Sequence, residues 1–318
     1  MADAFGAAKA AVCICTRARP VMLRRCLASL RVQALGDAPL QFLIIVVDND
    51  PAQSARPVFD EVIGAGGEYL VCAEPGIPFA RNAALDAALA ADADFIAFID
   101  DDEVAPPNWL QTLFLALLAS GADAAQGEVQ QVSCPEELKR RGLELLAASP
   151  QCEPVESIAT CNTLFKASLA KSPLSLRFDE AMRYTGGSDK DYFMRAHKAG
   201  ARVVRVRGAQ VIEEVAQGRE TLSYAAMRAF AAGNNYQLRM SKNESATVAF
   251  RRVAGRVVER GFSGTAKLVF AGLLSVLLQW RSAERQLRRG SANLSFALGC
   301  LAPLVGLRAH PYRVLQGT

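Results

Sequence analysis

Short apolar runs alternate with amphipathic helical patterns from residue 10 to residue 118, and this alternation limits the folds open to the chain. Four runs have the length and continuity of buried strands, at 10–15, 42–47, 69–72 and 95–99. A helical pattern follows each run, at 23–30, 58–63, 79–91 and 110–118. Apolar strands that alternate with helices predict the α/β class, with a mostly parallel sheet covered by helices on both faces.

Polar residues gather where three of these predicted strands end. Thr16 to Pro20 follows the first strand, Asp48 to Asp50 the second, and Asp100 to Glu103 the fourth. Parallel strands bring their carboxyl ends to the same edge of a sheet, which is where ligands bind in open α/β folds. The sequence therefore predicts one shared binding site at this edge.

The last of these clusters is a run of four acids, Asp100-Asp101-Asp102-Glu103. Adjacent carboxylates repel one another, and a divalent cation offsets that repulsion. Oxygen ligands of this kind suit Mg²⁺ or Mn²⁺, with substrate phosphates completing the coordination. By itself the run also fits a solvated acidic loop, or acids favoured by the dipole at the start of a helix.

Composition excludes several classes of protein. The chain has 318 residues and is 51% hydrophobic, which is enough apolar material for a large buried core. Its eight cysteines include no Cys-x-x-Cys pair and no Cys/His cluster of zinc-like spacing. No GxGxxG motif follows a strand, which argues against a dinucleotide oxidoreductase. The N-terminal sequence lacks the pattern of a secretory signal, so we expect the protein to act in the cytoplasm.

Five motifs follow one another along the chain. They are Thr16-Arg17-Ala18-Arg19-Pro20, Val47-Asp48-Asn49, Glu74-Pro75-Gly76 with Ala80-Arg81-Asn82, Asp100-Asp101-Asp102, and Gly186-Gly187-Ser188-Asp189-Lys190-Asp191. Each motif is weak alone, but the ordered set, over about residues 10 to 240, resembles the family 2 glycosyltransferases. The resemblance implies a GT-A fold and an inverting hexosyltransferase of the bacterial envelope or exopolysaccharide type. A helical appendage would follow the GT-A sheet.

The resemblance also implies a nucleotide diphosphate sugar as donor, with UDP as the commonest nucleotide. In the family, the acid that closes the second strand contacts the uracil or ribose, which assigns Asp48. The arginine of the Ala-Arg-Asn stretch lies near the diphosphate, which assigns Arg81, and a guanidinium fork suits phosphate oxygens. Thr16 and Arg19 are assigned to the loop over the nucleotide. Plain turn chemistry also explains Thr16, and a helix-surface position also explains Arg81.

The same resemblance divides the acidic run. Asp100 corresponds to the first acid of the family's Asp-x-Asp pair, near the ribose and the metal. Asp102 corresponds to the second acid, the direct ligand of Mg²⁺ or Mn²⁺, and Asp101 is the variable middle position within the nucleotide-sugar site. Glu213, which follows an apolar strand at 209–212, is the nearest substitute for a histidine that completes the metal or diphosphate site in some members.

The double-glycine motif supplies the predicted catalytic base. The corresponding stretch usually ends in Glu-Asp in the family and its Asp is the base, so the role falls on Asp189, with Ser188 in place of the Glu. Asp189 would take the proton from an acceptor hydroxyl as that oxygen attacks the anomeric carbon, and a single displacement inverts this centre. Gly187, Ser188 and Asp191 are assigned to the acceptor side. Capping of the following helix by Ser188 or Asp189 is the plainer alternative.

The C-terminal part differs from the rest in charge and texture. From Arg251 onward the chain has eleven Lys/Arg and two Asp/Glu, which gives this part a net charge of +9. The whole chain has a net charge of +4, so residues 1–250 have a net charge of −5. Two apolar stretches, 268–280 and 294–307, are too short to span a bilayer.

We expect residues 1–242 to form the catalytic domain and 243–318 a basic, apolar helical tail. The tail would lie at an anionic membrane surface, on the inner face of the cell membrane. Helices packed on the catalytic domain, or a short re-entrant hairpin, also fit the pattern.

The predicted function is metal-assisted, non-processive transfer of a sugar to a hydroxyl of a glycan or lipid-linked acceptor, with no nucleic acid as partner. A sugar-nucleotide pyrophosphorylase is the rival enzyme class, but it relies on a glycine-rich phosphate loop, and Thr16 to Pro20 contains no glycine. A membrane-associated protein that binds nucleotide sugars without turnover is the second alternative, and a donor-hydrolysis assay separates it from an enzyme.

Overall fold

The structure is a computed structural model that describes residues 7–132, 151–214 and 221–311. Contacts divide the chain into two compact units. The sheet unit comprises the described parts of 1–183 and 188–215, and the helical unit combines 184–187 with the described part of 216–315. A short segment from the middle of the chain therefore belongs to the helical unit.

The first half of the sheet unit alternates between strand and helix. Its main elements are β1 (Ala8–Thr16), α1 (Pro20–Arg31), β2 (Leu40–Asp48), α2 (Arg56–Val62), β3 (Gly67–Val71), α3 (Ile77–Ala90), β4 (Phe95–Phe98) and α4 (Trp109–Ser120). Every strand and helix predicted from the periodicity of this half is present, with ends shifted by a few residues. β3, β2, β1 and β4 lie side by side in that order and pair in parallel, as predicted.

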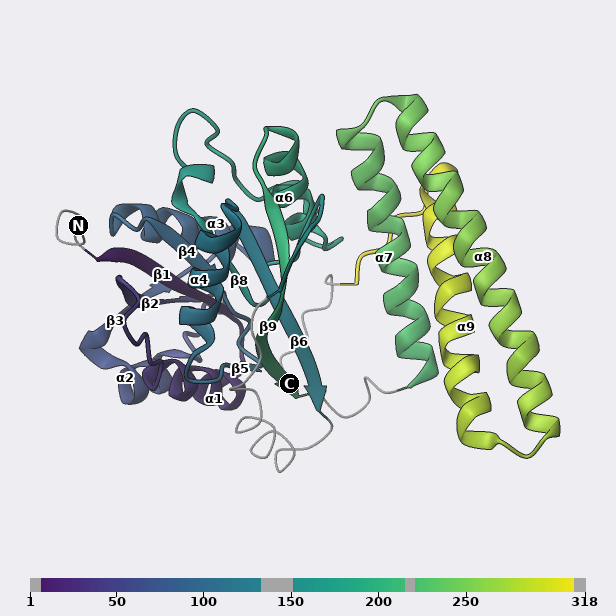
Figure 1. Cartoon of the computed structure of the whole chain (residues 1–318), viewed down its shortest axis with the longest axis horizontal. Coiled ribbons are helices and arrows are strands. Elements are labelled where there is room, and N and C mark those ends of the chain that lie inside the picture. The colour runs from purple at the N-terminus through teal and green to yellow at the C-terminus, as the bar shows by residue number, and fades with distance from the viewer. Residues whose placement is uncertain (1–6, 133–150, 215–220, 312–318) are drawn as a thin grey trace. The chain divides into compact units, whose positions relative to one another are not determined.

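The register of these parallel strands aligns their polar ends. Thr16, the last residue of β1, pairs with Asp48, the last residue of β2. Cys13 of β1 pairs with Phe98 at the end of β4, from which the chain runs on to Asp100. The three polar clusters therefore meet at one edge of the sheet, as the sequence predicts (Figure 1).

Beyond β4 the sheet is mixed. Its further strands are β5 (Glu103–Val104), β6 (Ala124–Val132), β7 (Gln151–Pro154), β8 (Thr163–Lys166) and β9 (Val203–Glu214). β8 is antiparallel to both β4 and β6, β9 is parallel to β6, and β5 and β7 are antiparallel to β9. The α/β class is confirmed, and this mixed half is a difference from the mostly parallel sheet expected. β6 carries Gln126, Glu128 and Gln130, so no apolar run marks it in the sequence.

Two apolar layers cover the sheet, one on each face. In β1, Val12 and Ile14 belong to the layer that includes the buried residues of α1 and α4. Ala11 and Cys13 belong to the opposite layer, together with the buried residues of α3. Helices therefore cover both faces, as predicted.

The second layer also holds α6 (Ser188–Lys198). The rings of Tyr192 and Phe193 are fully buried and lie 5.9 Å and 5.4 Å from the ring of Phe165, measured between centroids. Aromatic packing of this kind adds to the large apolar area that these side chains bury. The start of α6 carries Ser188 and Asp189, so the aromatic core fixes the helix on which these two residues lie.

The helical unit contains three long helices among the described residues, α7 (Leu222–Asn243), α8 (Ala246–Val276) and α9 (Trp280–Leu301). Figure 1 shows them side by side, with short connections that make successive helices antiparallel. Glycines lie where the helices cross, with Gly233 of α7 against Phe296 of α9 and Gly264 of α8 against Gly290 of α9. Because glycine has no side chain, the backbones approach closely at these points.

The predicted apolar stretches fall at the ends of α8 and α9. No described helix combines the length and the apolar character that a membrane crossing requires. α7 packs with α8 and α9 although it precedes residue 243, where the sequence suggests a boundary. The division into a catalytic domain, 1–242, and a tail, 243–318, stays a prediction about function.

Gly233→Ala should destabilise the helical unit. A Cβ at this position would lie 2.0 Å from the carbonyl oxygen of Phe296, so α7 and α9 must move apart. Overpacking of this kind costs roughly 1–3 kcal/mol of unfolding free energy. Thermal unfolding of the full chain by circular dichroism, combined with hydrogen exchange of the α7 and α9 amides, measures the loss.

Gly272→Ala in α8 is the matched control, because nothing lies within 4 Å of its Cβ position. The same substitution in open space should stabilise the helix by about 0.5–1 kcal/mol, since glycine is a poor helix residue. Equal effects of the two variants would contradict the close crossing of α7 and α9.

Candidate active site

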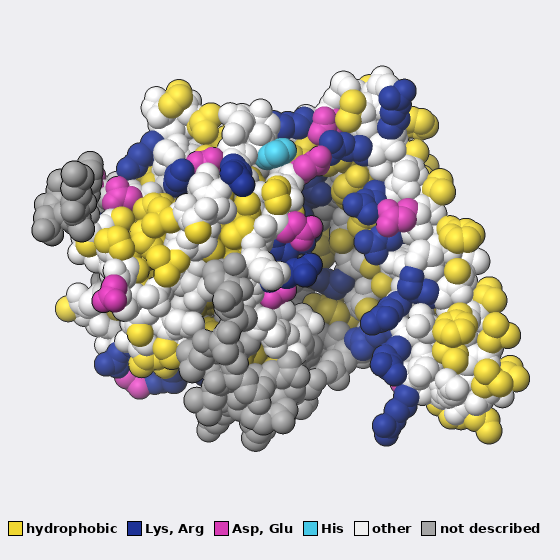
Figure 2. Space-filling view, in the orientation of Figure 1, with side chains coloured by type: hydrophobic (Ala, Val, Ile, Leu, Met, Phe, Trp, Pro, Cys, Tyr) yellow, Lys and Arg dark blue, Asp and Glu magenta, His cyan; other side chains and the backbone are white. Residues whose placement is uncertain are grey.

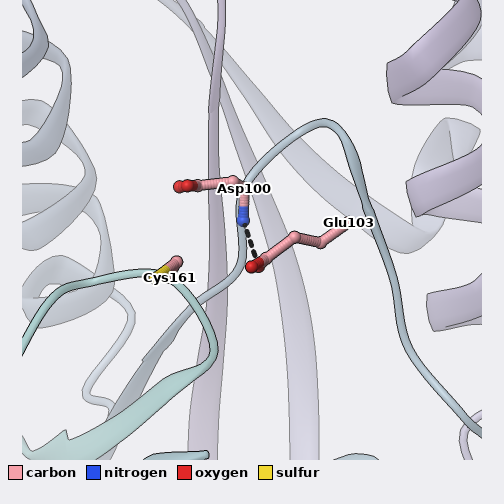
Figure 3. A group of neighbouring side chains, drawn as sticks. All are labelled: Asp100, Glu103 and Cys161. Atoms are coloured by element: carbon pink, nitrogen blue, oxygen red, sulfur yellow. Dashed lines mark hydrogen bonds between the residues drawn. The ribbon is translucent and has the colours of Figure 1, made fainter. Parts of the chain in front are cut away.

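The run of acids forms a tight turn between β4 and β5. The backbone N–H of Asp100 donates to a carboxylate oxygen of Glu103 at 2.9 Å, and the N–H of Glu103 donates to the carbonyl of Asp100 at 3.1 Å. Figure 3 shows the Glu103 carboxylate turned back toward the backbone of Asp100. Glu103 also pairs with Glu213 where β5 meets β9. The sheet therefore anchors the turn at both of its ends.

Burial raises the pKa of three carboxyl groups of this turn, those of Asp100, Asp101 and Glu103. Burial first, and then the charge of Asp102, raise the pKa of Asp100 to about 7, against the opposing charge of Arg81. Burial is also the largest cause that raises the pKa of Asp101 to about 6. The pKa of Glu103 is raised well above its usual value by burial and by the charge of Asp100. Either protons or a bound cation would offset the repulsion in such a turn.

The loop after β1 holds the middle of the acidic turn. Thr16 donates its hydroxyl to one carboxylate oxygen of Asp101 at 2.7 Å. Nη1 of Arg19 lies 3.2 Å from the other oxygen of Asp101 and 3.4 Å from an oxygen of Asp102. Asp101 is buried, and both of its oxygens are bound. Thr16 and Arg19 therefore lie on the acidic turn itself, and their contact with a nucleotide stays a prediction.

Asp48 is fully buried at the end of β2. Its carboxylate accepts hydrogen bonds from the N–H of Asp50 at 3.0 Å, the N–H of Ala55 at 2.9 Å and the hydroxyl of Tyr69 at 2.8 Å. These bonds fix the loop between β2 and α2. The predicted contact of Asp48 with uracil or ribose stays a prediction.

Asn49 ties this loop to the start of α3, although the sequence analysis assigned no role to this residue of the second motif. Its amide donates to the carbonyls of Cys72 at 2.8 Å and Glu74 at 2.6 Å, and its side-chain oxygen accepts the N–H of Gly76 at 2.9 Å. Gly76 precedes α3 with φ at +136°, a region that favours glycine. The turn that positions the predicted Arg81 is therefore held by one buried amide.

Arg81 connects the acidic turn to α6. Its guanidinium lies over the ring of Phe178, 5.6 Å from the centroid, and Nη1 donates to the hydroxyl of Ser188 at 3.3 Å. The charge of Arg81 lowers the pKa of Asp100, whereas the charge of Asp189 raises it. The hydrogen bond puts Arg81 beside Ser188, the residue that precedes Asp189 in the chain. The structure thus gathers predicted residues from three separate motifs.

The double glycine precedes α6 in an unusual backbone conformation. Gly186 and Gly187 have φ values of +77° and +82°, in the left-handed region. Asp189 follows in the first turn of α6 and is half-buried. Asp191 is fully buried, and its carboxylate accepts a hydrogen bond from Nε of Arg195 at 2.8 Å. Asp191 therefore stabilises the helix, and its acceptor-side role stays a prediction.

A group of potential metal ligands lies at the turn. Donor atoms of Asp100, Glu103 and Cys161 are all within 4.8 Å of one another (Figure 3). Burial raises the pKa of the Cys161 thiol, so this group stays protonated and is a poor ligand. The carboxylates are hard oxygen donors, which fit Mg²⁺ or Mn²⁺. Asp102, the predicted direct ligand, is not in this group and lies beside Arg19.

Cys161 of this group and the neighbouring Glu213 come from parts of the chain far from the acidic run. Cys161 precedes β8 in an irregular segment, and no sequence pattern pointed to it. Glu213 was selected from its place after an apolar strand, and its register partner is Glu103. Its carboxylate accepts a hydrogen bond from Gln131 at 3.0 Å. The structure therefore puts Glu213 beside the acidic turn, while its part in a metal or diphosphate site stays a prediction.

The mixed sheet with its flanking helices has the GT-A fold. The crystal structure of S. aureus TarS, residues 1–349, aligns with a TM-score of 0.52, covering 98% of this chain and 95% of that one. The two sequences are 16% identical, so this likeness concerns the fold alone.

Residues 11–172, just over half of the chain, match the family described as glycosyl transferase family 2, and the chain belongs to this family. This confirms the family resemblance and removes the pyrophosphorylase alternative. The succinoglycan biosynthesis protein ExoM of Rhizobium meliloti (strain 1021) is 28% identical over 306 residues, which cover 93% of this chain and 92% of ExoM. ExoW of the same organism, also named for succinoglycan biosynthesis, is 36% identical over 110 residues, or 33% of this chain and 32% of ExoW.

Proposed function

We propose that this glycosyltransferase moves a sugar from a UDP-sugar to a hydroxyl of a glycan or lipid-linked acceptor, with inversion and one sugar per encounter. The observation that carries the proposal is the convergence of Asp100, Arg81 and Asp189 at the carboxyl edge of the sheet. Ligands bind at this edge in open α/β folds. ExoM, which matches nearly the whole chain, is named for succinoglycan biosynthesis, and this supports a glycan as the product.

Two arginines supply positive charge for the diphosphate of the donor. Arg81 is held by the ring of Phe178 and the hydroxyl of Ser188, so its guanidinium is fixed before the donor binds. Arg19 lies on the other side of the acidic turn, on Asp101 and Asp102. A guanidinium fork matches pairs of phosphate oxygens. Asp48 holds the loop between β2 and α2, and this loop forms one side of the proposed nucleotide site.

The acidic turn is the proposed place of a divalent cation, Mg²⁺ or Mn²⁺. Asp102 is the proposed direct ligand, and Asp100 and Glu103 add negative charge beside it. When bound, the cation neutralises charge that grows on the departing nucleoside diphosphate. Arg19 keeps Asp101 and Asp102 in place until then, because it pairs with both carboxylates.

Asp189 is the proposed catalytic base. It lies in the first turn of α6, where the helix dipole favours a carboxylate. Tyr192 and Phe193 lock this helix into the core, so the carboxylate has a fixed place near Asp100 and Arg81. From there it accepts the proton of the attacking hydroxyl, and a single displacement inverts the anomeric centre.

Asp189→Asn should lower turnover roughly a hundredfold or more, which is the size expected for a positioned general base. The assay is release of UDP from a panel of UDP-sugars in the presence of Mn²⁺, first with water as the acceptor and then with glycans. UDP affinity, measured by calorimetry, should stay unchanged. Asp37→Asn, in the exposed loop before β2, is the control. A variant that loses UDP affinity but keeps turnover would make Asp189 a binding residue.

Asp102→Asn should abolish UDP release and weaken Mn²⁺ binding by more than about tenfold, because a direct ligand is lost. Paramagnetic resonance of free Mn²⁺ measures the binding, and Asp37→Asn is again the control. Mn²⁺ binding that is weakened by Asp100→Asn and by Glu103→Gln but unchanged in Asp102→Asn would instead put the ion at the group of Asp100, Glu103 and Cys161. Full activity after treatment with a chelator would refute metal use.

The exposed face of α8 supports a further proposal, that the helical unit binds a membrane surface. Val258, Phe262, Val269, Leu273 and Val276 are spaced by four, seven, four and three residues, so they share one face of the helix. All five are exposed, Phe262 by 80% and Val276 by 81%. Figure 2 shows hydrophobic side chains gathered along this helix. An exposed apolar stripe of this length marks an interaction surface.

α9 adds positive charge to the same helical unit. Arg281, Arg285, Arg288 and Arg289 are exposed and share one face of the first half of α9. Each arginine near an anionic leaflet contributes about 1 kcal/mol. We propose that the partner of this surface is anionic lipid, which would place the enzyme at the inner face of the cell membrane.

The full chain should float with phosphatidylglycerol vesicles and much less with phosphatidylcholine vesicles, and high salt should weaken the binding. Phe262→Ser combined with Val276→Ser should reduce flotation severalfold without lowering the unfolding midpoint, because both residues are exposed. Leu118→Ser, which removes an exposed leucine of α4, is the control. Equal flotation of both variants would contradict the proposal. A dimer of the full chain in gel filtration that becomes a monomer in the Phe262→Ser, Val276→Ser variant would also contradict the proposal, because the stripe would then bind a second copy of the chain.

A further inference from the structure

A cluster of hydrogen-bond donors lies where α8 packs against α9 in the helical unit. Nη1 of Arg260 donates to Oδ1 of Asn293 at 2.8 Å, and Nδ2 of Asn293 donates to the hydroxyl oxygen of Ser263 at 3.2 Å. Nζ of Lys267 donates to the same oxygen of Ser263. The four side chains therefore form one continuous chain of hydrogen bonds with a cation at each end, which we call the α8–α9 cluster.

The packing of the two helices fixes the place of this cluster. Its three members on α8 are spaced by three and four residues, so they share one face of that helix. Gly264, which lies among them in the chain, meets Gly290 of α9 at the close crossing. Asn293 follows Gly290 by less than one turn of α9. All four members are half-buried, and a half-buried charge interacts more strongly with a ligand than one surrounded by water.

The cluster contains more donors than acceptors. An arginine carries five N–H groups and a lysine three, and neither side chain can accept. The acceptors within the cluster, Oδ1 of Asn293 and Oγ of Ser263, already receive hydrogen bonds from these donors. Nε of Arg260 is buried and has no hydrogen-bond partner among the described residues. The cluster is therefore complementary to a ligand that supplies several acceptor oxygens.

No ion pair joins Arg260 or Lys267 to a carboxylate of the described residues, so both cations lack a neutralising partner there. α8 and α9 each contain one acid. Glu259 of α8 pairs with Arg256 at 2.8 Å. Glu284 of α9 is exposed and lies more than two turns before the α9 member of the cluster. The ligand that fits the cluster must therefore be an anion.

We propose that the α8–α9 cluster binds a phosphate group. A phosphate combines negative charge with several acceptor oxygens, and arginine and lysine are the side chains that bind it. The group can belong to a lipid headgroup or to a soluble phosphate, since the chemistry at the cluster is the same. The helical unit then has a selective ligand in addition to the general attraction between its arginines and anionic lipid. The inference does not rest on the proposed sugar transfer.

Asn293→Asp is the sharpest test, because it supplies the missing negative charge inside the cluster. The two side chains have nearly the same shape, and a carboxylate accepts from Arg260 and from the hydroxyl of Ser263. The unfolding midpoint of the full chain at low salt should therefore not fall. The response to phosphate should disappear, since Arg260 is then paired. Arg251→Gln, at an exposed position of α8, is the control, because it lowers the net charge by the same one unit.

Inorganic phosphate and lipid vesicles are the two probes. If the cluster binds soluble phosphate, inorganic phosphate should raise the unfolding midpoint of the wild type above its value in chloride at the same pH and ionic strength, because a ligand of the folded state stabilises it. Vesicles that contain phosphatidic acid should bind the wild type about tenfold more tightly than phosphatidylglycerol vesicles of equal surface charge, the size of one added charge-assisted hydrogen bond. This preference without a response to inorganic phosphate would identify a lipid headgroup as the ligand.

Either response supports the inference if Arg251→Gln keeps it and Asn293→Asp loses it. No response in the wild type, or equal responses in the two variants, would overturn it. Lys267→Gln provides the same comparison, with the same change in net charge, if Asn293→Asp does not fold. Flotation that depends on Phe262 and Val276 but not on Asn293 would overturn this inference alone and leave the proposed membrane surface intact.

Discussion

Repulsion between carboxylates in one buried turn is the constraint around which the edge of the sheet is arranged. Thr16 and Arg19 occupy both oxygens of Asp101, and Arg81 opposes the rise in the pKa of Asp100. These residues come from the end of β1, the loop after it, and α3. The parallel pairing of β1 with β4 therefore brings Thr16 and Arg19 to the acidic turn that follows β4, and α3 brings Arg81. The charge that remains matches a hard divalent cation.

Periodicity predicted the parallel half of the sheet and the edge where the polar clusters meet, because both follow from local pattern and from the geometry of parallel strands. It did not predict how individual side chains are used. Asp48 stands where it was expected, yet its oxygens are occupied by Tyr69 and by the backbone of the following loop. Arg19 likewise lies on Asp101 and Asp102. Such pairings depend on loop conformations that no sequence spacing encodes.

Two residues reach the site through non-local pairing: Cys161, which no sequence pattern indicated, and Glu213, which the sequence analysis had selected. Cys161 lies beside Asp100 because β8 is antiparallel to β4, and Glu213 lies opposite Glu103 because β9 meets β5. Neither pairing follows from helix and strand alternation, which is the signal of parallel βαβ units.

The helical unit combines close glycine crossings with large apolar side chains on its surface. Glycines occupy the crossings inside it, such as Gly264 against Gly290, whereas Phe262 and Val276 face outward. In a bundle surrounded by water, large apolar side chains fill the interior because their burial drives folding. Close glycine crossings with apolar side chains outside are what helices adopt when lipid covers their outer faces. The lipid surface proposed for α8 would cover Phe262 and Val276 and so remove the cost of that arrangement.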